Sequence, residues 1–222
     1  MPHPKGGYKL RDGTKVPGVT TILGRFKESG GLLHWAFEQG QSCERGEISD
    51  LYDKRDEAAS AGTLAHSMVE RHINGEDLPD LTTYSNEVAA AATQGYENYI
   101  RWADDNRMVI VDQEMELVSE RYAFGGCPDA IATNSKSQIC LLDWKTSSGI
   151  YVDYLCQCAA YKILWEENRP EQPITGGIHL LRFSKENADF HHHFWNDLSE
   201  AGELFILLRR AYDLDKKLKK RI

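Results

Sequence analysis

Asp143, Trp144 and Lys145 place a carboxylate and an ammonium group two positions apart, a spacing that could support chemistry. They end an apolar run that begins at Gln138, which predicts a buried strand. Because side chains two apart on a strand share a face, Asp143 and Lys145 should point together and Trp144 away from them. By itself the triplet is more typical of a surface ion pair, since short motifs often match by chance.

A second carboxylate, Asp129, lies on the preceding predicted strand. If the two strands pair through a loop at 134–138, Asp129 stands opposite Asp143, whereas a loop of another length would move the pair to a diagonal. Two opposed carboxylates repel each other, and a hard divalent cation such as Mg²⁺ or Mn²⁺ removes that conflict. Lys145 beside the ion could stabilise charge on a phosphoryl group or orient a water molecule. The set suggests metal-assisted phosphodiester hydrolysis.

Two helical pairs could complete this site. His66 and Glu70 share one helix face, and a histidine facing the carboxylates could join the metal ligands. Gln157 and Tyr161 share a face of the helix after the lysine, where they could support Lys145 or contact a phosphate or base. The simpler alternatives are a packed or solvent-facing histidine, and a half-buried tyrosine beside a surface glutamine.

The rest of the chain supplies the elements that must position these residues. Hydrophobic periodicity predicts a hairpin around Asp12 and Gly13, then helices over 32–41, 53–73, 85–105 and 153–168 and a last helix capped by Asn196. Strands are expected over 108–118, 121–133, 138–144, 174–183 and 190–195. This order predicts an α/β fold with a central mixed sheet flanked by helices on both faces. We expect one domain over 1–222, made of an N-terminal hairpin and helices (1–107), a sheet core (108–195) and a C-terminal helix (196–222).

Composition narrows the classes of protein. The net charge of −8 over 222 residues argues against a histone-like coating protein. Five cysteines without a CxxC pair indicate reduced thiols, and no apolar run reaches the ~20 residues of a membrane span, so we expect a cytoplasmic protein without a membrane partner. The run His191–His193 is better explained by an edge strand than by a metal site. The basic stretch Lys216–Arg221 fits a helix C-terminus and DNA binding about equally.

Four motifs, in this order, resemble the RecB-like branch of the PD-(D/E)XK nuclease superfamily. They are GxxxH (Gly62–His66), GGxPD (Gly125–Asp129), DWKTS (Asp143–Ser147) and QxxAY (Gln157–Tyr161). The segment Val16–Leu23 is also similar to the "PSVTTIL" segment of phage and mitochondrial-maintenance exonucleases of that branch. The resemblance implies a restriction-endonuclease-like core with an N-terminal helical elaboration.

The resemblance also implies roles for the matching residues. Metal ligands would come from Asp129, Asp143, His66 and the backbone carbonyl of Trp144, and Lys145 would be the catalytic lysine. Substrate contacts would come from Gln157, Tyr161, Thr20 and Thr21, while Glu70 has no firm role. Two departures stand out. Gly18 replaces the usual serine, and no cysteine follows Cys158, so the iron–sulfur cluster of some relatives is not expected.

The sequence therefore predicts a Mg²⁺- or Mn²⁺-dependent DNA exonuclease that acts in recombination, repair or DNA end-processing. Its partners would be DNA, single-stranded or duplex, and a recombination protein such as a single-strand annealing or binding protein. If the gene is phage-encoded, the location is the host cytoplasm. Two alternatives stay open: a catalytically silent DNA- or partner-binding module of the same fold, and a structure-specific endonuclease.

Overall fold

The computed structural model describes residues 6–27, 37–38, 40–46, 53–184 and 187–222, with the side chains of 53–60 left undescribed. The helices are α1 (Val19–Phe26), α3 (Asp53–Asn74), η1 (Leu81–Thr83), α4 (Asn86–Asp105), α5 (Val152–Asn168) and α6 (Ser199–Lys219). The strands are β1 (Tyr8–Lys9), β2 (Lys15–Val16), β3 (Val109–Gln113), β4 (Leu117–Ser119), β5 (Phe124–Gly126), β6 (Ala130–Thr133), β7 (Ile139–Thr146), β8 (Ile178–Phe183) and β9 (Phe190–Trp195).

The central sheet has five strands in the order β3-β6-β7-β8-β9. β7 and β8 run parallel, joined through α5, and the other neighbouring pairs are antiparallel. A parallel pair needs a crossover connection, which α5 provides, so the sheet is mixed. Two short two-stranded sheets, β1-β2 and β4-β5, lie outside it.

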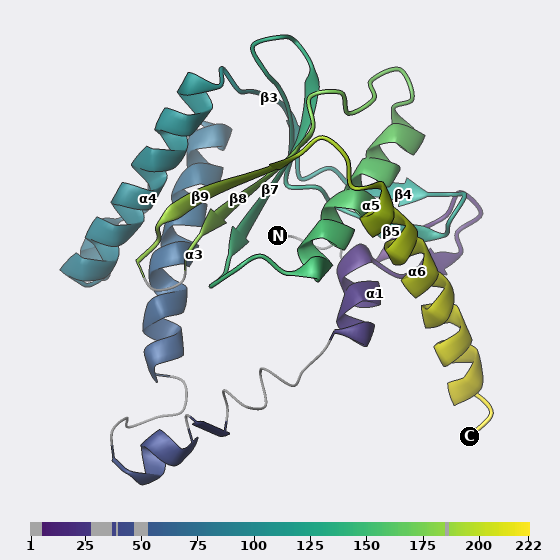
Figure 1. The fold of residues 1–222 in the computed structure, drawn as a ribbon, viewed down its shortest axis with the longest axis horizontal. Coiled ribbons are helices and arrows are strands. Elements are labelled where there is room, and N and C mark those ends of the chain that lie inside the picture. Colours follow the sequence, from purple (N-terminus) through teal and green to yellow (C-terminus); the bar gives the residue numbers. More distant parts are fainter. Residues whose placement is uncertain (1–5, 28–36, 39, 47–52, 185–186) are drawn as a thin grey trace.

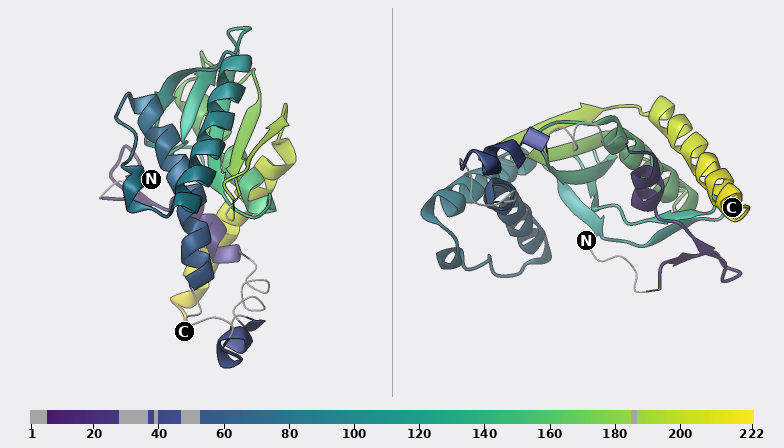
Figure 2. Two further views of the ribbon diagram at one scale, coloured as in Figure 1. Left: turned by 90° about the vertical axis from the view of Figure 1, so that its left-hand side faces the viewer. Right: turned by 90° about the horizontal axis from the view of Figure 1, so that it is seen from below.

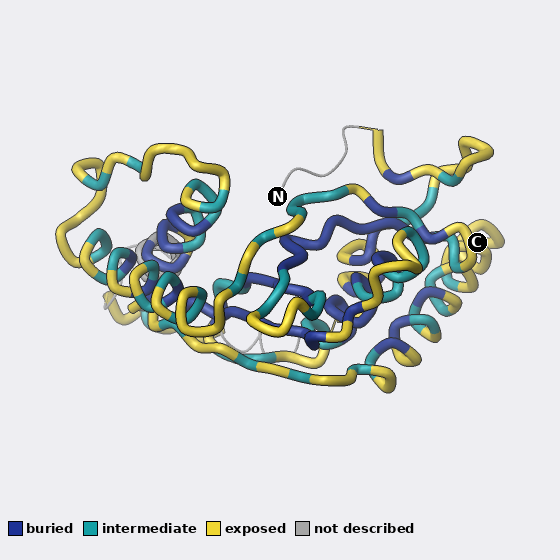
Figure 3. Tube along the Cα trace, turned by 90° about the horizontal axis from the view of Figure 1, so that it is seen from above, coloured by how far each residue is buried: buried dark blue, intermediate teal, exposed yellow. Residues whose placement is uncertain are grey.

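Helices cover both faces of the sheet, as Figures 1 and 2 show. α3 and α4 pack on one face, while α1, α5 and α6 gather on the other. Each interface encloses its own cluster of buried side chains, with Trp144 in the first and Tyr161 in the second. Figure 3 shows the buried residues concentrated in the sheet and along the inner sides of the helices. The predicted α/β class and flanked mixed sheet are confirmed.

Local sequence signals account for the elements nearest the site. Residues 140–144 are all buried, as expected for the central strand of a sheet covered on both faces. Ser85 caps α4, because its hydroxyl accepts a hydrogen bond from the backbone N–H of Val88 at 3.3 Å. β7 is thus the buried central strand of the sheet, and Asp143 and Lys145 lie near its carboxyl end.

The structure corrects three expectations. The strands expected over 108–118 and 121–133 are each divided in two, because β4 and β5 leave the central sheet and pair with each other. Residues 174–177 do not extend β8. Asn196 does not cap the last helix; Leu198 is at that position, and the Asp197 carboxylate accepts the backbone N–H of Ser199 at 3.1 Å. Residues 32–36 and 39 of the helix expected over 32–41 lie outside the described residues.

Among the helices that the structure describes, none is long and apolar enough to span a membrane.

Candidate active site

The hairpin of β6 and β7 sets the position of the two aspartates. Its Cα partners include Ala130 with Leu142 and Thr133 with Ile139, which is the register expected from a 134–138 loop. Asn134 stabilises this loop through its side-chain oxygen, which accepts the backbone N–H groups of Lys136 and Gln138 at 2.9 and 3.1 Å. Continued by one residue, the register places Asp129 opposite Asp143.

Asp143 and Lys145 point to the α5 side of the sheet and form an ion pair. Asp143 is completely buried, and Lys145 Nζ lies 3.3 Å from the backbone carbonyl of Trp144 and 5.5 Å from the ring centroid of Tyr154. Burial alone would lower the pKa of Lys145, but the charges of Asp143 and Asp129 outweigh it and hold that pKa above its usual value. The lysine is therefore charged at neutral pH.

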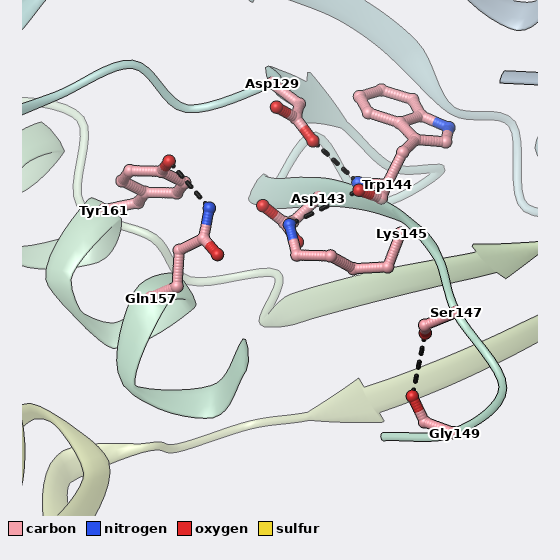
Figure 4. A network of polar contacts seen from close by, with 8 residues as sticks. All are labelled: Asp129, Asp143, Trp144, Lys145, Ser147, Gly149, Gln157 and Tyr161. Carbon is pink, nitrogen blue, oxygen red and sulfur yellow. Dashed lines mark hydrogen bonds and ion pairs between the residues drawn. The ribbon is translucent and has the colours of Figure 1, made fainter. Parts of the chain in front are cut away.

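Asp129 is 7% exposed, and its carboxylate is only half satisfied. Oδ2 accepts the backbone N–H of Trp144 at 2.8 Å, whereas Oδ1 is buried without a hydrogen-bond partner (Figure 4). Burial and then the charge of Asp143 raise the pKa of Asp129 to about 8, against smaller opposing effects of Lys145 and the Trp144 N–H. Burial away from water is the larger cause, and the neighbouring carboxylate adds to it.

The donor chemistry fits a hard divalent cation. Buried carboxylate oxygens without hydrogen bonds are costly unless a cation or proton compensates them, and Oδ1 of both aspartates is in this state. Mg²⁺ commonly needs only one or two protein carboxylates and keeps several waters. Asp129, Asp143 and the Trp144 carbonyl would hold such an ion. In the described part of the chain, no three His, Cys, Asp or Glu side chains are already arranged to hold a metal.

His66 reaches the region from the other side of the sheet. Gly62 allows this approach, because a Cβ there would collide with the Thr146 side chain and lie 3.0 Å from the Ser184 carbonyl. The imidazole stacks on the Trp144 ring, with centroids 6.4 Å apart and planes 18° apart. Burial lowers the pKa of His66, so the ring is neutral at pH 7, the form that binds metals. Trp144 and His66 thus lie together on the α3 side of β7, and the ligand role of His66 stays a prediction.

Glu114 lies at the site although no sequence motif includes it. A cavity of about 30 Å³ is lined by His66, Glu70, Glu114 and Asp129, with Val69, Ile73, Gln113 and Trp144 completing its wall. This is enough room for a water-sized particle. Glu114 follows β3, has a left-handed φ of 48° and donates its backbone N–H to the Asp129 carbonyl at 3.1 Å.

Glu114 and Glu70 interact with each other across this cavity. Burial, then a hydrogen bond with Glu70 and its charge, raise the pKa of Glu114. Glu70 therefore gains a place in the site that the motifs did not give it. The only signal for Glu114 is the pairing of β3 with β6. Gln113, the last residue of β3, pairs with Ala130, so the residue after it, Glu114, comes next to Asp129.

Gln157 and Tyr161 project from α5 toward the aspartates (Figure 4). Gln157 Nε2 donates to the Tyr161 hydroxyl at 2.8 Å, and both residues are buried. Burial and then the charges of Asp143 and Asp129 raise the pKa of Tyr161 well above its usual value. Since its oxygen accepts from Gln157, the Tyr161 hydroxyl proton is available to another acceptor in the site.

Thr20 and Thr21 lie exposed in the first turn of α1. Gly18, which caps this helix, forms an isolated parallel bridge with Gly125, the residue that starts the segment leading to Asp129. A Cβ at Gly18 would lie 3.0 Å from the Tyr8 ring, so a serine at this position would require that ring to shift. This bridge holds the start of α1, with the two threonines, beside β5, the strand that precedes Asp129.

The structure therefore brings Asp129, Asp143 and Lys145 together in the central sheet. The sequence profile of the PD-(D/E)XK nuclease superfamily matches residues 7–219, so the chain belongs to that superfamily. Members of it generally use divalent metals such as Mg²⁺, in agreement with the donor chemistry described above.

Solved structures that resemble this one include three with low sequence identity. A protein provisionally assigned as an exonuclease, from Eubacterium rectale, is 16% identical over 68% of each chain, with a TM-score of 0.40. SSO0001 is 10% identical over 82% of this chain and 85% of its own, with a TM-score of 0.33. The alkaline exonuclease LHK-Exo of Laribacter hongkongensis is 9% identical over 74% of this chain and 93% of its own, with a TM-score of 0.31. A search of curated proteins found no match.

Proposed function

We propose that this protein is a Mg²⁺- or Mn²⁺-dependent DNA exonuclease that acts in recombination, repair or DNA end-processing, and that residues 1–222 work as one catalytic domain. The observation that carries the proposal is the buried pair Asp129 and Asp143, with unsatisfied oxygens, beside the charged Lys145. Buried like charges are destabilising, and a site for a hard cation and a phosphate gives them a use.

The chain's own residues would divide the work as follows. Asp129, Asp143 and the Trp144 carbonyl would hold the ion, with His66 as a further ligand. A bound Mg²⁺ or Mn²⁺ supplies positive charge that polarises a phosphoryl oxygen and makes water a better nucleophile. Lys145 would leave its ion pair with Asp143 and donate to the attacking water or to the negative charge that develops on the phosphate.

The surrounding residues would orient the substrate. The Gln157–Tyr161 pair would present the Tyr161 hydroxyl to a phosphate or to a water in the site. Thr20 and Thr21 would contact the DNA backbone from the first turn of α1. Glu114, whose pKa is raised by burial and by its contact with Glu70, would accept a proton or bind a water at the edge of the cavity.

The test is digestion of end-labelled linear single-stranded and duplex DNA in Mg²⁺, Mn²⁺ and chelator in parallel, together with covalently closed circular DNA. We expect progressive loss of label from linear substrates only when a metal is present. Lys145→Ala should reduce cleavage by at least about a hundredfold, as expected for loss of a transition-state charge partner, while DNA binding persists. The matched control is Lys136→Ala, which removes an exposed lysine from the loop between β6 and β7.

Other results would favour other functions. Wild-type cleavage rates in Lys145→Ala would refute the role of the lysine. Cleavage of closed circles would identify an endonuclease, and DNA binding without cleavage in either metal would identify a silent binding module. A recombination partner, such as a single-strand annealing or binding protein, is proposed on the resemblance alone and would be tested by co-purification with the candidate protein.

A further inference from the structure

Two tyrosines at the start of α5 continue outward from the candidate catalytic lysine. The ring centroid of Tyr154 lies 5.5 Å from Lys145 Nζ. The ring of Tyr151 meets that of Tyr154 edge to face, with centroids 5.4 Å apart and planes 84° apart. We call Tyr151 and Tyr154 the tyrosine ledge. The ledge connects the reaction centre with solvent through two aromatic rings.

The outer ring of the ledge is open although its position is fixed. Tyr151 is 47% exposed, and its hydroxyl shares a hydrogen bond of 2.9 Å with the Ser148 hydroxyl in the loop between β7 and α5. The hydrophobic effect favours burial of large aromatic side chains. A ring that is held in place and still faces water is therefore suited to binding a ligand with an apolar or aromatic face.

The setting of the ledge adds apolar and cationic groups. Lys27, at the end of α1, forms an ion pair of 3.1 Å with Asp153 in the first turn of α5 and lies near both ledge tyrosines. Exposed Phe26 and Val152 flank that ion pair in the sequence, at 39% and 64% exposure. The surface around the Lys27–Asp153 ion pair therefore carries exposed aromatic and apolar side chains, and the charge of Asp153 is paired.

We propose that the tyrosine ledge stacks an unpaired nucleobase of the strand being cut, so that the substrate class is DNA with single-stranded ends. This inference rests on the proposed nuclease function. Nucleobases stack on aromatic side chains with little regard to sequence, whereas bases in a duplex are already paired and stacked. A phosphate held beside Lys145 carries its base to a neighbouring position, and the ledge offers an exposed aromatic ring on the α5 side.

The ledge also explains why these residues are tyrosines rather than aliphatic residues. The π face of Tyr154 attracts the lysine ammonium, and the edge of the same ring packs against Tyr151. A base stacked on Tyr151 would extend this series of rings by one member. A duplex end could use the ledge only after its terminal pair had opened, which costs energy that a single strand does not pay.

The experiment measures binding without cleavage. The full-length protein is titrated, with Ca²⁺ in place of Mg²⁺, into a 15-nucleotide single strand that carries 2-aminopurine near one end and fluorescein at the other, and into the blunt duplex of the same sequence. The fluorescence of 2-aminopurine reports stacking and the anisotropy of fluorescein reports binding. We compare wild type with Tyr151→Ala, Tyr151→Phe and, as matched control, Tyr84→Ala, which removes another exposed tyrosine, just before α4 on the opposite face of the sheet.

We expect wild type, Tyr151→Phe and Tyr84→Ala to quench 2-aminopurine in the single strand. Tyr151→Ala should not quench it and should bind the single strand roughly 5- to 100-fold more weakly, with duplex binding changed less than about twofold. Thermal melting confirms that the variants are folded.

Three results would overturn the inference: wild-type protein that binds the single strand without quenching or fails to bind it, Tyr151→Ala that quenches normally, or equal loss of single-strand and duplex binding, which would mark a general backbone contact. The binding assay does not depend on cleavage, so the two proposals can fail separately. A protein that binds the strand and stacks its base but does not cut it in Mg²⁺ would refute the nuclease proposal and still support base stacking on the ledge.

Discussion

Replacing Asp129 by asparagine tests the central physical claim about the site, that two buried carboxylates are kept for a cation. In the metal-free protein, Asp129 and Asp143 carry two negative charges when both are ionised, and Lys145 supplies one positive charge. Asparagine keeps an oxygen to accept the Trp144 N–H and removes the charge. We therefore expect Asp129→Asn to be more stable than wild type in chelator at pH 8.

The pH dependence follows from the raised pKa of Asp129. Its pKa is about 8 in the folded protein against a usual 3.8, so between these values the unfolded state binds fewer protons than the folded state. The free energy of unfolding must then fall as the pH rises through that window. Between pH 6 and pH 8 the loss is roughly 2 kcal/mol, from 1.36 kcal/mol per proton and pH unit. For a chain of this size that corresponds to roughly 4–8 °C in Tm, and Asp129→Asn should lose this slope.

Metal binding should offset this loss in the free energy of unfolding. A ligand at a hundred times its dissociation constant adds about 2.7 kcal/mol, or roughly 5–10 °C. Because the ion and the proton compete for Asp129, wild type should gain more at pH 8 than at pH 6, and Asp129→Asn should gain little at either pH. Mg²⁺ and Mn²⁺ are compared with chelator by differential scanning calorimetry.

The control is Glu203→Gln, which removes an exposed carboxylate on α6 and should behave as wild type. A wild-type Tm that responds to neither metal at either pH would refute the proposed cation site. An equal response in Asp129→Asn would show that the ion binds elsewhere, and a flat wild-type profile in chelator would refute the raised pKa of Asp129.

Three further predictions concern the surroundings of the site. Tyr154→Leu should lower kcat about tenfold and move the basic limb of the pH–rate profile, which reports Lys145, to lower pH, because the ring face stabilises the ammonium. Tyr154→Phe should restore both, and an unchanged profile in the leucine variant would contradict this role. Glu114→Gln should reduce kcat more than KM in single-turnover and steady-state assays, and a change in KM alone would place Glu114 outside the chemical step. Gly62→Ala should cost about 1–3 kcal/mol in denaturant unfolding because its Cβ meets the end of β7, whereas Gly24→Ala, which has open space in α1, should be neutral or stabilising; equal effects would contradict the packing argument.

The hairpin that carries the two aspartates was predictable from sequence because its geometry is local. A short loop between two apolar runs leaves few registers, and the expected one is observed for β6 and β7. Alternation along a strand then puts Asp143 and Lys145 on one face and Trp144 on the other. The order of the four motifs added the family, which the profile match confirms.

What the sequence could not decide is which helix faces which side of that hairpin. α3 packs on the Trp144 side, so His66 stacks on the indole ring and lines the same cavity as Asp129. Glu114 joins Glu70 only because β3 ends early and pairs with β6. Such contacts join residues that lie far apart in the chain, and they depend on how complete side chains pack, for which periodicity carries no signal. Local pattern therefore determined the residues that can do the chemistry, and tertiary packing decided which of them meet.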